Sequence, residues 1–339
     1  MAIDKQGKPI IGVLLGDSTG VGPEIVTKLM AKRFYDDICR PIFIGDVRIV
    51  KAGLDTFGGT AEYYAISDPE EADWSRGYPV LDTGDQDPAR IVMGRPDPYC
   101  GGAGVNAFKL ACRLCREGKI EGFCFGPYHK VAMIEAGCEF ESEHNLIAHE
   151  LGAGIFGETN VVDNLITVRC TSHVPLKDVS SHLSQERIIQ ITELGYNTAR
   201  SMGIADPRIG VAGLNPHCGE QGLCGTEEIE IIAPAVEKLK ARGWNVQGPI
   251  SSDILFNRAF NKEEFDVAVT MYHDQGQIAT KLRGFERGIT VSGGQPYPVV
   301  TCGHGTAYGR AGQGRAQTSS FENAVKMTAR MALAKRAAE

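Results

Sequence analysis

Three histidines lie in segments whose neighbouring residues favour exposure and a fixed backbone geometry. They are His173, His217 and His273, and each follows an apolar run typical of a strand and is flanked by Pro, Gly, Asn or Asp. Strand ends are where α/β folds place their chemistry, and three neutral imidazoles that leave room for water or substrate commonly hold a divalent metal ion. One such histidine alone is more often a surface or capping residue, but three in the same context favour a metal site.

A second candidate cluster is the Gly-rich segment 301–316, which follows a strand-like run and precedes the last helical pattern. Within it, His304, Gly305, Thr306 and Ala307 combine an adaptable backbone, an imidazole and a hydroxyl. Such a loop lets the backbone approach a planar ring closely while the side chains contact a ribose or a phosphate. The segment therefore indicates a nucleotide site, and a connecting loop without function is the alternative.

The first Gly-rich segment, 16–24, is interpreted as structural. Its spacing is not G-x-G-x-x-G, and no Lys-Ser or Lys-Thr pair follows as in a P-loop. Acidic Asp17 and Glu24 would repel a pyrophosphate instead of binding it. We expect a tight turn that has Pro23 in the first helical turn and lines a cleft.

Cys112 and Cys115 share one face of a predicted helix, which favours core packing over a zinc or redox pair. Cys218, beside His217, is a better thiol candidate, but one neighbouring thiol is weak evidence for a ligand. Four further histidines lie in or near polar helical stretches and are individually interpreted as surface residues: His129, His144, His149 and His182.

Strand and helix patterns alternate almost throughout the chain. The apolar runs that predict strands are 9–16, 41–45, 122–126, 164–169, 208–213 and 266–271. Helical patterns cover 21–34, 105–117, 186–202, 227–242 and 321–338. Continuous apolar strands separated by helices are typical of an α/β fold whose mainly parallel sheet is covered on both faces.

Composition narrows the class of protein. A chain of 339 residues with 42% hydrophobic and 23% charged residues is an ordinary soluble globular protein, long enough for two lobes. The net charge of −7 argues against nucleic acid as the main partner. Ten scattered cysteines are typical of a reducing compartment, and no run approaches the roughly 20 apolar residues of a membrane span. Residues 1–7 lack the apolar stretch of a signal peptide, so we expect a cytoplasmic protein with no membrane partner.

Four motifs carry a resemblance to a known family: Gly-Leu-Asn-Pro-His-Cys-Gly-Glu at 213–220, Gly-Thr-Glu-Glu-Ile at 225–229, Met-Tyr-His-Asp-Gln-Gly at 271–276 and His-Gly-Thr-Ala at 304–307. The chain resembles the 4-hydroxythreonine-4-phosphate dehydrogenase family over nearly its whole length. It is more distantly similar to the isocitrate and isopropylmalate dehydrogenases.

The resemblance implies roles for individual residues. It implies that His173, His217 and His273 hold a divalent metal (Zn, Mg, Mn or Co), and that the 304–307 loop contacts NAD or NADP. It also implies that Lys281 and Asp253 are catalytic, by charge neutralisation or proton transfer. The substrate-binding residues that it implies are His144, Lys281 and Thr290, with His144 matched by a one-residue shift.

The resemblance further implies a fold of two α/β lobes of isocitrate/isopropylmalate dehydrogenase-like type, with the active site in the cleft between them. The first lobe would comprise residues 1–131 plus 300–339 and contain both termini, and the second would comprise residues 132–299 and carry the metal ligands and dimer contacts. A homodimer would complete a shared site, with one subunit lending metal ligands to the other.

The implied activity is metal-dependent, NAD(P)-linked oxidation of a small hydroxy acid with decarboxylation, as in pyridoxine biosynthesis. Two departures bear on the substrate, because Val299 stands where the family has an arginine and Thr290 where it has an asparagine. Valine cannot offer a charged fork to an anion. We therefore expect weak use of 4-hydroxythreonine 4-phosphate and better use of a different carboxylate-bearing alcohol.

Other functions stay open at the level of sequence. One is a relative that acts on an unphosphorylated substrate, such as a cis-dihydrodiol carboxylate. A metal hydrolase without redox chemistry could use the same three histidines to activate water, although the 304–307 loop argues against it. A non-catalytic metal- or nucleotide-binding protein is the third.

Overall fold

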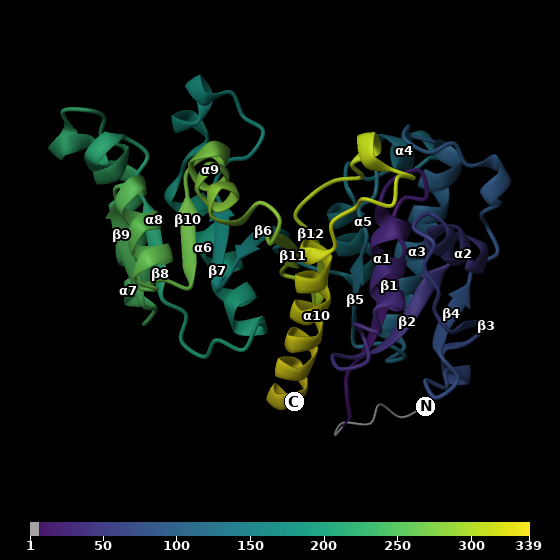
Figure 1. The fold of residues 1–339 in the computed structure, drawn as a ribbon. Helices are drawn as coiled ribbons and strands as arrows, with labels where there is room; N and C mark the ends of the chain where they lie inside the picture. The colour runs from purple at the N-terminus through teal and green to yellow at the C-terminus, as the bar shows by residue number, and fades with distance from the viewer. Residues whose placement is uncertain (1–6) are drawn as a thin grey trace. The chain divides into compact units, whose positions relative to one another are not determined.

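Residues 7–339 of the computed structural model divide into two units, and each unit contains six of the β-strands (Figure 1). Unit 1 contains the chain up to Gly154 together with Gln295–Glu339, and unit 2 is Ile155–Gly294. Residues 1–6, which carry most of the argument against a signal peptide, lie outside the described residues. Within 7–339, no helix combines the length and the apolar character needed to cross a bilayer.

Unit 1 is built on a parallel sheet in the order β3-β4-β2-β1-β5-β12. Its strands are β1 (Ile10–Leu14), β2 (Arg40–Gly45), β3 (Tyr63–Ile66), β4 (Tyr78–Asp82), β5 (Gly122–Phe125) and β12 (Val299–Cys302). Every residue of β1, β5 and β12 is buried, as continuous apolar runs covered on both faces predict.

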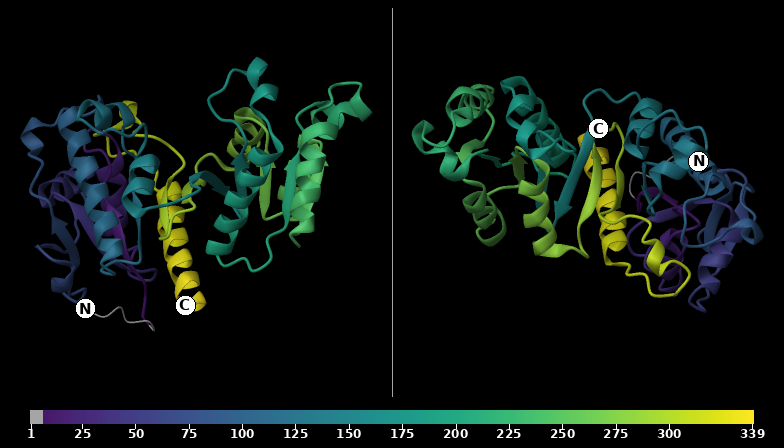
Figure 2. Two further views of the ribbon diagram at one scale, coloured as in Figure 1. Left: turned by 180° about the vertical axis from the view of Figure 1, so that it is seen from behind. Right: turned by 90° about the horizontal axis from the view of Figure 1, so that it is seen from above.

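The helices of unit 1 are α1 (Gly22–Ala31), α2 (Val47–Asp55), α3 (Pro98–Arg116), α4 (Lys130–Glu135), α5 (Glu143–Leu151) and α10 (Ser319–Ala338). α10 packs on β5 and β12 and can be followed in yellow in Figures 1 and 2. α3 begins before the predicted Val105, because Asp97 caps it by accepting a hydrogen bond from the Tyr99 backbone N–H and Pro98 occupies its first turn.

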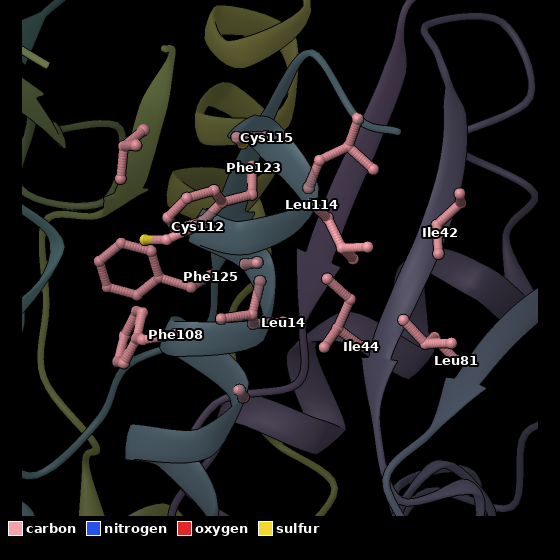
Figure 3. Close-up of a cluster of buried hydrophobic side chains, with 14 of the residues drawn as sticks. Leu14, Ile42, Ile44, Leu81, Phe108, Cys112, Leu114, Cys115, Phe123 and Phe125 are labelled. Atoms are coloured by element: carbon pink, nitrogen blue, oxygen red, sulfur yellow. The ribbon is translucent and has the colours of Figure 1, made fainter. Parts of the chain in front are cut away.

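The core on the α3 side of this sheet confirms the interpretation of the two helical cysteines. Figure 3 shows Phe108 and Cys112 of α3 beside Phe125 of β5, all within one buried cluster that also includes Cys115. The Phe108 and Phe125 rings meet edge to face with centroids 5.0 Å apart. Burial raises the pKa of the Cys112 thiol to about 12, so it is a packing group and not a thiolate.

The units divide at different positions from those expected from the sequence, 131/132 and 299/300. α4 and α5 pack against α3, and Leu146 and Ile147 of α5 belong to the same buried cluster as Phe108. The residues from 132 to 154 therefore lie in unit 1, because their apolar side chains complete its core. Val299 also belongs to this cluster, as part of β12.

Unit 2 has a mixed sheet in the order β11-β6-β7-β10-β8-β9, antiparallel where β6 pairs with β11 and β7 and parallel elsewhere. Its strands are β6 (Gly157–Val162), β7 (Leu165–Arg169), β8 (Ile209–Ala212), β9 (Val246–Ile250), β10 (Val267–Thr270) and β11 (Ile289–Gly293). Its helices are α6 (Gln185–Ser201), α7 (Ala233–Ala241), α8 (Ser252–Asn261) and α9 (His273–Gly284).

Glycines show how helices cover the two faces of this sheet. A Cβ added to Gly195 of α6 would meet Val168 and Val267, whereas a Cβ added to Gly276 of α9 would meet Thr167 and Thr270. Successive side chains of a strand point to opposite faces, so α6 and α9 lie on opposite sides of β7 and β10. α8 contacts β8 and β10. α9 begins at His273, directly at the carboxyl end of β10, so the helix places this candidate ligand at the sheet edge.

Candidate active site

The three candidate metal ligands follow three strands that are neighbours in the sheet of unit 2. His173 comes after β7, His273 after β10 and His217 after β8, and the sheet order is β7-β10-β8 with all three strands parallel. The carboxyl ends of parallel strands meet at one edge, so all three segments leave the sheet on the same side. His173 and His217 are exposed and His273 is partly buried.

Two of these imidazoles lie together within one chain. The ring centroids of His173 and His273 are 6.1 Å apart, with an angle of 41° between the ring planes. His273 Nδ1 lies 2.7 Å from Asp274 Oδ1. A carboxylate on one ring nitrogen fixes the tautomer and directs the other nitrogen toward a metal, so His273 has the partner that ligating histidines usually have.

His217 occupies a segment with an unusual backbone. His217, Cys218, Glu220 and Gln221 all have positive φ values, of 50°, 55°, 44° and 60°, inside the short helical segment Pro216–Gly222. Among residues 7–339, no three His, Cys, Asp or Glu side chains converge closely enough to hold a metal ion. The single chain therefore brings together two of the three candidate ligands, a pair that suits one half of an imidazole-bound metal site.

The two candidate catalytic residues lie on the helices that follow β9 and β10. Asp253 is in the first turn of α8 and Lys281 is on α9, and both side chains are exposed. The Lys281 side chain has no hydrogen-bond or ion-pair partner in the part of the chain that the structure describes.

Thr290 belongs to a polar network next to His273 that the sequence did not reveal. Its hydroxyl accepts a hydrogen bond from Asn160 Nδ2 at 3.2 Å, and Asn160 Oδ1 accepts from Arg169 at 2.7 Å and from Gln277 at 2.6 Å. Asn160, Arg169, Gln277 and His273 line a cavity of about 10 Å³, room for about one water. The position of Arg169 at the end of an apolar run, four residues before His173, was the signal that could have identified it.

In unit 1 the 304–307 loop lies on the segment that follows β1. Val21 N–H donates to the Thr306 carbonyl at 3.1 Å, and a Cβ on Gly20 would come within 2.9 Å of Thr306 Cβ. Thr306 is buried by this packing, whereas Gly305 and Ala307 are exposed. The segment 16–24 is therefore the tight turn that was predicted, and the candidate nucleotide loop packs against it.

The acidic side chains of that turn accept hydrogen bonds from other groups of the protein. Asp17 Oδ1 accepts from the Thr19 N–H at 2.9 Å and from its hydroxyl at 2.7 Å. Glu24 Oε1 accepts from Lys28 Nζ and from the Ala316 N–H, each at 2.7 Å. Glu24 thus fixes the far end of the Gly-rich segment 301–316 to α1.

Tyr308 and His129, which the sequence did not single out as site residues, extend the surroundings of this loop. Their rings stack with centroids 5.3 Å apart, and the Tyr308 hydroxyl donates to Asp17 Oδ2 at 3.3 Å. A cavity of about 740 Å³ also occurs in unit 1, at the amino ends of β2 and β4, and it contains none of the predicted site residues.

Three other sequence interpretations have outcomes in the structure. His144 is 4% exposed on α5, so its interpretation as a surface residue is wrong. Val299 is fully buried in β12 and offers no contact to an anion. Burial raises the pKa of the Cys218 thiol, with the carboxylates of Glu228 and Asp253 adding to the rise.

Comparison with known proteins gives one consistent result. A family model described as the pyridoxal phosphate biosynthetic protein PdxA matches residues 37–328. The D-threonate 4-phosphate dehydrogenase of Cupriavidus necator is 37% identical over 326 residues, covering 96% of this chain and 97% of the relative. A 4-hydroxythreonine-4-phosphate dehydrogenase of Desulforapulum autotrophicum is 36% identical over 326 residues, covering 96% of each chain.

Solved structures agree with the sequence relatives. The crystal structure of a 4-hydroxythreonine-4-phosphate dehydrogenase from Burkholderia phymatum is similar with a TM-score of 0.82 and 34% identity, over 96% of this chain and 99% of that one. A terephthalate 1,2-cis-dihydrodiol dehydrogenase from Burkholderia xenovorans LB400 is similar with a TM-score of 0.65 and 25% identity, over 95% and 97%.

Proposed function

The chain belongs to the PdxA family and is a dehydrogenase that acts on a CH–OH group, and from this premise we propose that it oxidises a phosphorylated hydroxy acid with NAD or NADP in a metal-dependent reaction. Loss of carbon dioxide from the oxidised acid completes the proposed reaction. The family membership implies the nicotinamide cofactor, and the arrangement of histidines supports the metal.

The observation that carries the metal proposal is the His173–His273 pair, in which Asp274 orients His273. These two imidazoles would hold the ion, and His217 would supply a third. When bound, such an ion lowers the pKa of the substrate hydroxyl and stabilises negative charge on its oxygen.

Proton transfer is assigned to the two exposed groups on neighbouring helices, Lys281 and Asp253. Both side chains are accessible to a bound substrate, and Lys281 has no competing partner in the described chain. We infer that Lys281 also contacts the substrate, and that Thr290 acts through the Asn160 network instead of touching the substrate itself.

The cofactor is assigned to unit 1. Thr306 is held against Gly20 and Val21, which fixes the loop, while Gly305 and Ala307 remain accessible for close approach of an adenosine ring. His304 Nδ1 lies 3.0 Å from the Gly305 carbonyl, an interaction that orients its ring.

A second copy of the chain is the proposed partner. Ile278, Leu282 and Phe285 are all exposed and lie four and three residues apart, so they form one apolar stripe on and just beyond α9. Leu282 is 84% exposed. The stripe begins five residues after His273, and one chain groups only two of the candidate ligands. A copy that covers the stripe lies near the incomplete site and can complete it.

The relatives support two phosphorylated substrates, 4-hydroxythreonine 4-phosphate and D-threonate 4-phosphate. An unphosphorylated carboxylate is the second candidate, because Val299, where the family places an arginine, is buried in the core. Comparing turnover of D-threonate and D-threonate 4-phosphate with each cofactor decides between them.

The experiment that tests the proposed function is removal and return of the metal. Dialysis against a chelator is expected to abolish NAD(P)-linked turnover, and Zn²⁺, Mn²⁺, Mg²⁺ or Co²⁺ added singly is expected to restore it. The His173→Ala variant should not recover, whereas His182→Ala, which removes an exposed histidine in the same unit, should behave as wild type. Full turnover by the exhaustively chelated enzyme would contradict the proposal.

A further inference from the structure

We propose that Glu228 is a positioning residue that holds the His217 loop in its ligand-bearing conformation, a role that rests on the proposed metal site. Glu228 lies in the π-helical segment Glu228–Ile232, which precedes α7, and not in any of the three histidine loops. It does not contact a substrate or an ion in this proposal. It acts through the backbone that carries His217.

The carboxylate of Glu228 makes three hydrogen bonds to two consecutive residues of the loop. Its Oε1 accepts from the backbone N–H groups of Leu214 and Asn215, each at 2.7 Å, and its Oε2 accepts from Asn215 Nδ2 at 2.9 Å. Two backbone donors on a single oxygen fix the direction in which the chain leaves β8. His217 follows Asn215 by only two residues, so this direction sets where its imidazole begins.

The loop needs such a restraint because its backbone is strained. His217 and Cys218 have φ values of 50° and 55°, in the left-handed region that residues with a Cβ seldom adopt. Strained conformations persist only where surrounding contacts over-determine them, and they concentrate at functional sites. Loop glycines admit the carboxylate, since a Cβ on Gly219 would lie 2.9 Å from Glu228 Oε2.

The electrostatics of Glu228 point to a functional site. Its side chain is 2% exposed, and among residues 7–339 it forms no ion pair with Lys, Arg or His. Burying a carboxylate without a cation is costly, and three hydrogen bonds from the loop offset that cost. A divalent ion on His217 would place positive charge near this carboxylate, which links the loop conformation to metal binding.

A second restraint acts on the same loop from the His273 side. Gln275 of α9 donates to the Gly213 carbonyl at 2.8 Å, and its side-chain oxygen accepts from the Met271 N–H at 2.7 Å. Gln275 therefore joins the loop after β8 to the start of the helix that carries His273. Glu228 binds the next two residues, Leu214 and Asn215, so Gln275 and Glu228 together restrain the backbone from Gly213 to Asn215.

Glu227 offers a matched control. It lies beside Glu228, and it accepts from Asn215 Nδ2 at 2.7 Å and from Ser180 at 2.6 Å, but it takes no hydrogen bond from the loop backbone. The Glu227→Gln and Glu228→Gln variants therefore make the same change in charge and size. Only Glu228→Gln places an amide where the three donors of Leu214 and Asn215 converge.

The test measures Zn²⁺ affinity in the full-length metal-free protein, by competition with a fluorescent chelator, for wild type and both variants. Loss of a partner that orients a metal ligand typically lowers metal affinity by about 10- to 100-fold, so Glu228→Gln is expected to fall in that range and Glu227→Gln by less than about threefold. Circular dichroism and thermal unfolding establish that each variant is folded. Equal Zn²⁺ affinity in wild type and a folded Glu228→Gln variant overturns the inference.

A measurement on wild type covers the case in which Glu228→Gln does not fold. Hydrogen exchange in the metal-free protein is expected to show that the Leu214 and Asn215 amides are protected relative to that of Gly222. Unprotected Leu214 and Asn215 amides would overturn the proposed role of Glu228. Failure of the proposed function gives a different result. In that case wild type itself binds no Zn²⁺, or binds it unchanged in His217→Ala, while the exchange experiment still decides the role of Glu228.

Discussion

Arg169 is the charged side chain that lines the small cavity beside His273. Its guanidinium donates to Ser172 Oγ at 2.8 Å, to Asn160 Oδ1 at 2.7 Å and to Glu158 Oε2 at 3.0 Å. Five N–H groups are available on arginine, so two remain after these three bonds. Thr167 also lines the cavity, and its Oγ1 is buried without a hydrogen-bond partner within the described residues. These groups suit an anionic or hydroxyl oxygen of the substrate.

Replacing Arg169 by Met is expected to raise KM for the hydroxy acid by roughly 10-fold or more, because a charge-assisted hydrogen bond contributes about 1.5–3 kcal/mol. KM for NAD(P) should not change, since the cofactor is assigned to unit 1. Steady-state kinetics with each substrate varied in turn gives both values.

Arg283→Met is the control for Arg169, because Arg283 pairs with Asp163 at 3.0 Å on the surface, where ion pairs contribute little. An unchanged KM for the hydroxy acid in a folded Arg169→Met variant would contradict substrate binding by Arg169. It would leave Arg169 only the structural role of joining β6 to β7.

At the scale of elements, the sequence predicts the buried interior strands best. β1, β5 and β10 are short, wholly buried and uninterrupted, so their apolar runs identify them. The predicted runs missed the interior strands β4, β6 and β11. They also missed the edge strands β3 and β9, which are mainly partly exposed, and β9 contains Pro249 and Gly248. Such strands have the composition of loops.

The same contrast holds for the candidate site. His173, His217 and His273 stand out in the sequence because turn-forming residues surround them at strand ends. The left-handed backbone of His217 could not be predicted, because the residue is not a glycine and the loop is held by long-range contacts from Glu228 and Gln275. The Asn160 network joins β6, β7, α9 and β11, elements that only the folded sheet brings together.

The tie between α1 and the Gly-rich segment is expected to control cofactor affinity. Glu24→Ala removes the acceptor of the Ala316 N–H and of Lys28, which leaves the far end of the 301–316 segment held by the Lys28 bonds to the Gly314 and Ala316 carbonyls. We expect NAD(P) affinity to fall about 10-fold, which corresponds to about 1.4 kcal/mol and to the lower end of a charge-assisted bond. Isothermal titration with NAD and NADP measures the change.

Zn²⁺ affinity should be unaffected by Glu24→Ala, because the candidate metal ligands belong to unit 2. Asp55→Ala, which breaks the exposed Lys51–Asp55 pair of α2, is the matched loss of a carboxylate and should leave both affinities unchanged. Equal loss of cofactor affinity in Glu24→Ala and Asp55→Ala is the outcome that argues against a specific anchor.

At the scale of the whole molecule, the proposed metal site is shared between two copies of the chain. The chain groups His173 with His273, and among residues 7–339 no three His, Cys, Asp or Glu side chains are arranged so that they could hold a metal ion. A twofold interface places the same surface of both copies in contact, so the α9 stripe of one subunit can bring the other subunit's His217 to this pair. The cleft between two lobes that the sequence predicts stays a prediction.

Subunit mixing tests the shared metal site most directly. His217→Ala and His273→Ala proteins are each expected to be inactive, and a mixture that has exchanged subunits should recover about a quarter of wild-type activity, because half the dimers are mixed and each has one intact site. A mixture of His173→Ala with His273→Ala should recover nothing, because those two ligands lie in one chain. Recovery in the second mixture, or none in the first after mixed dimers are verified, would contradict the account.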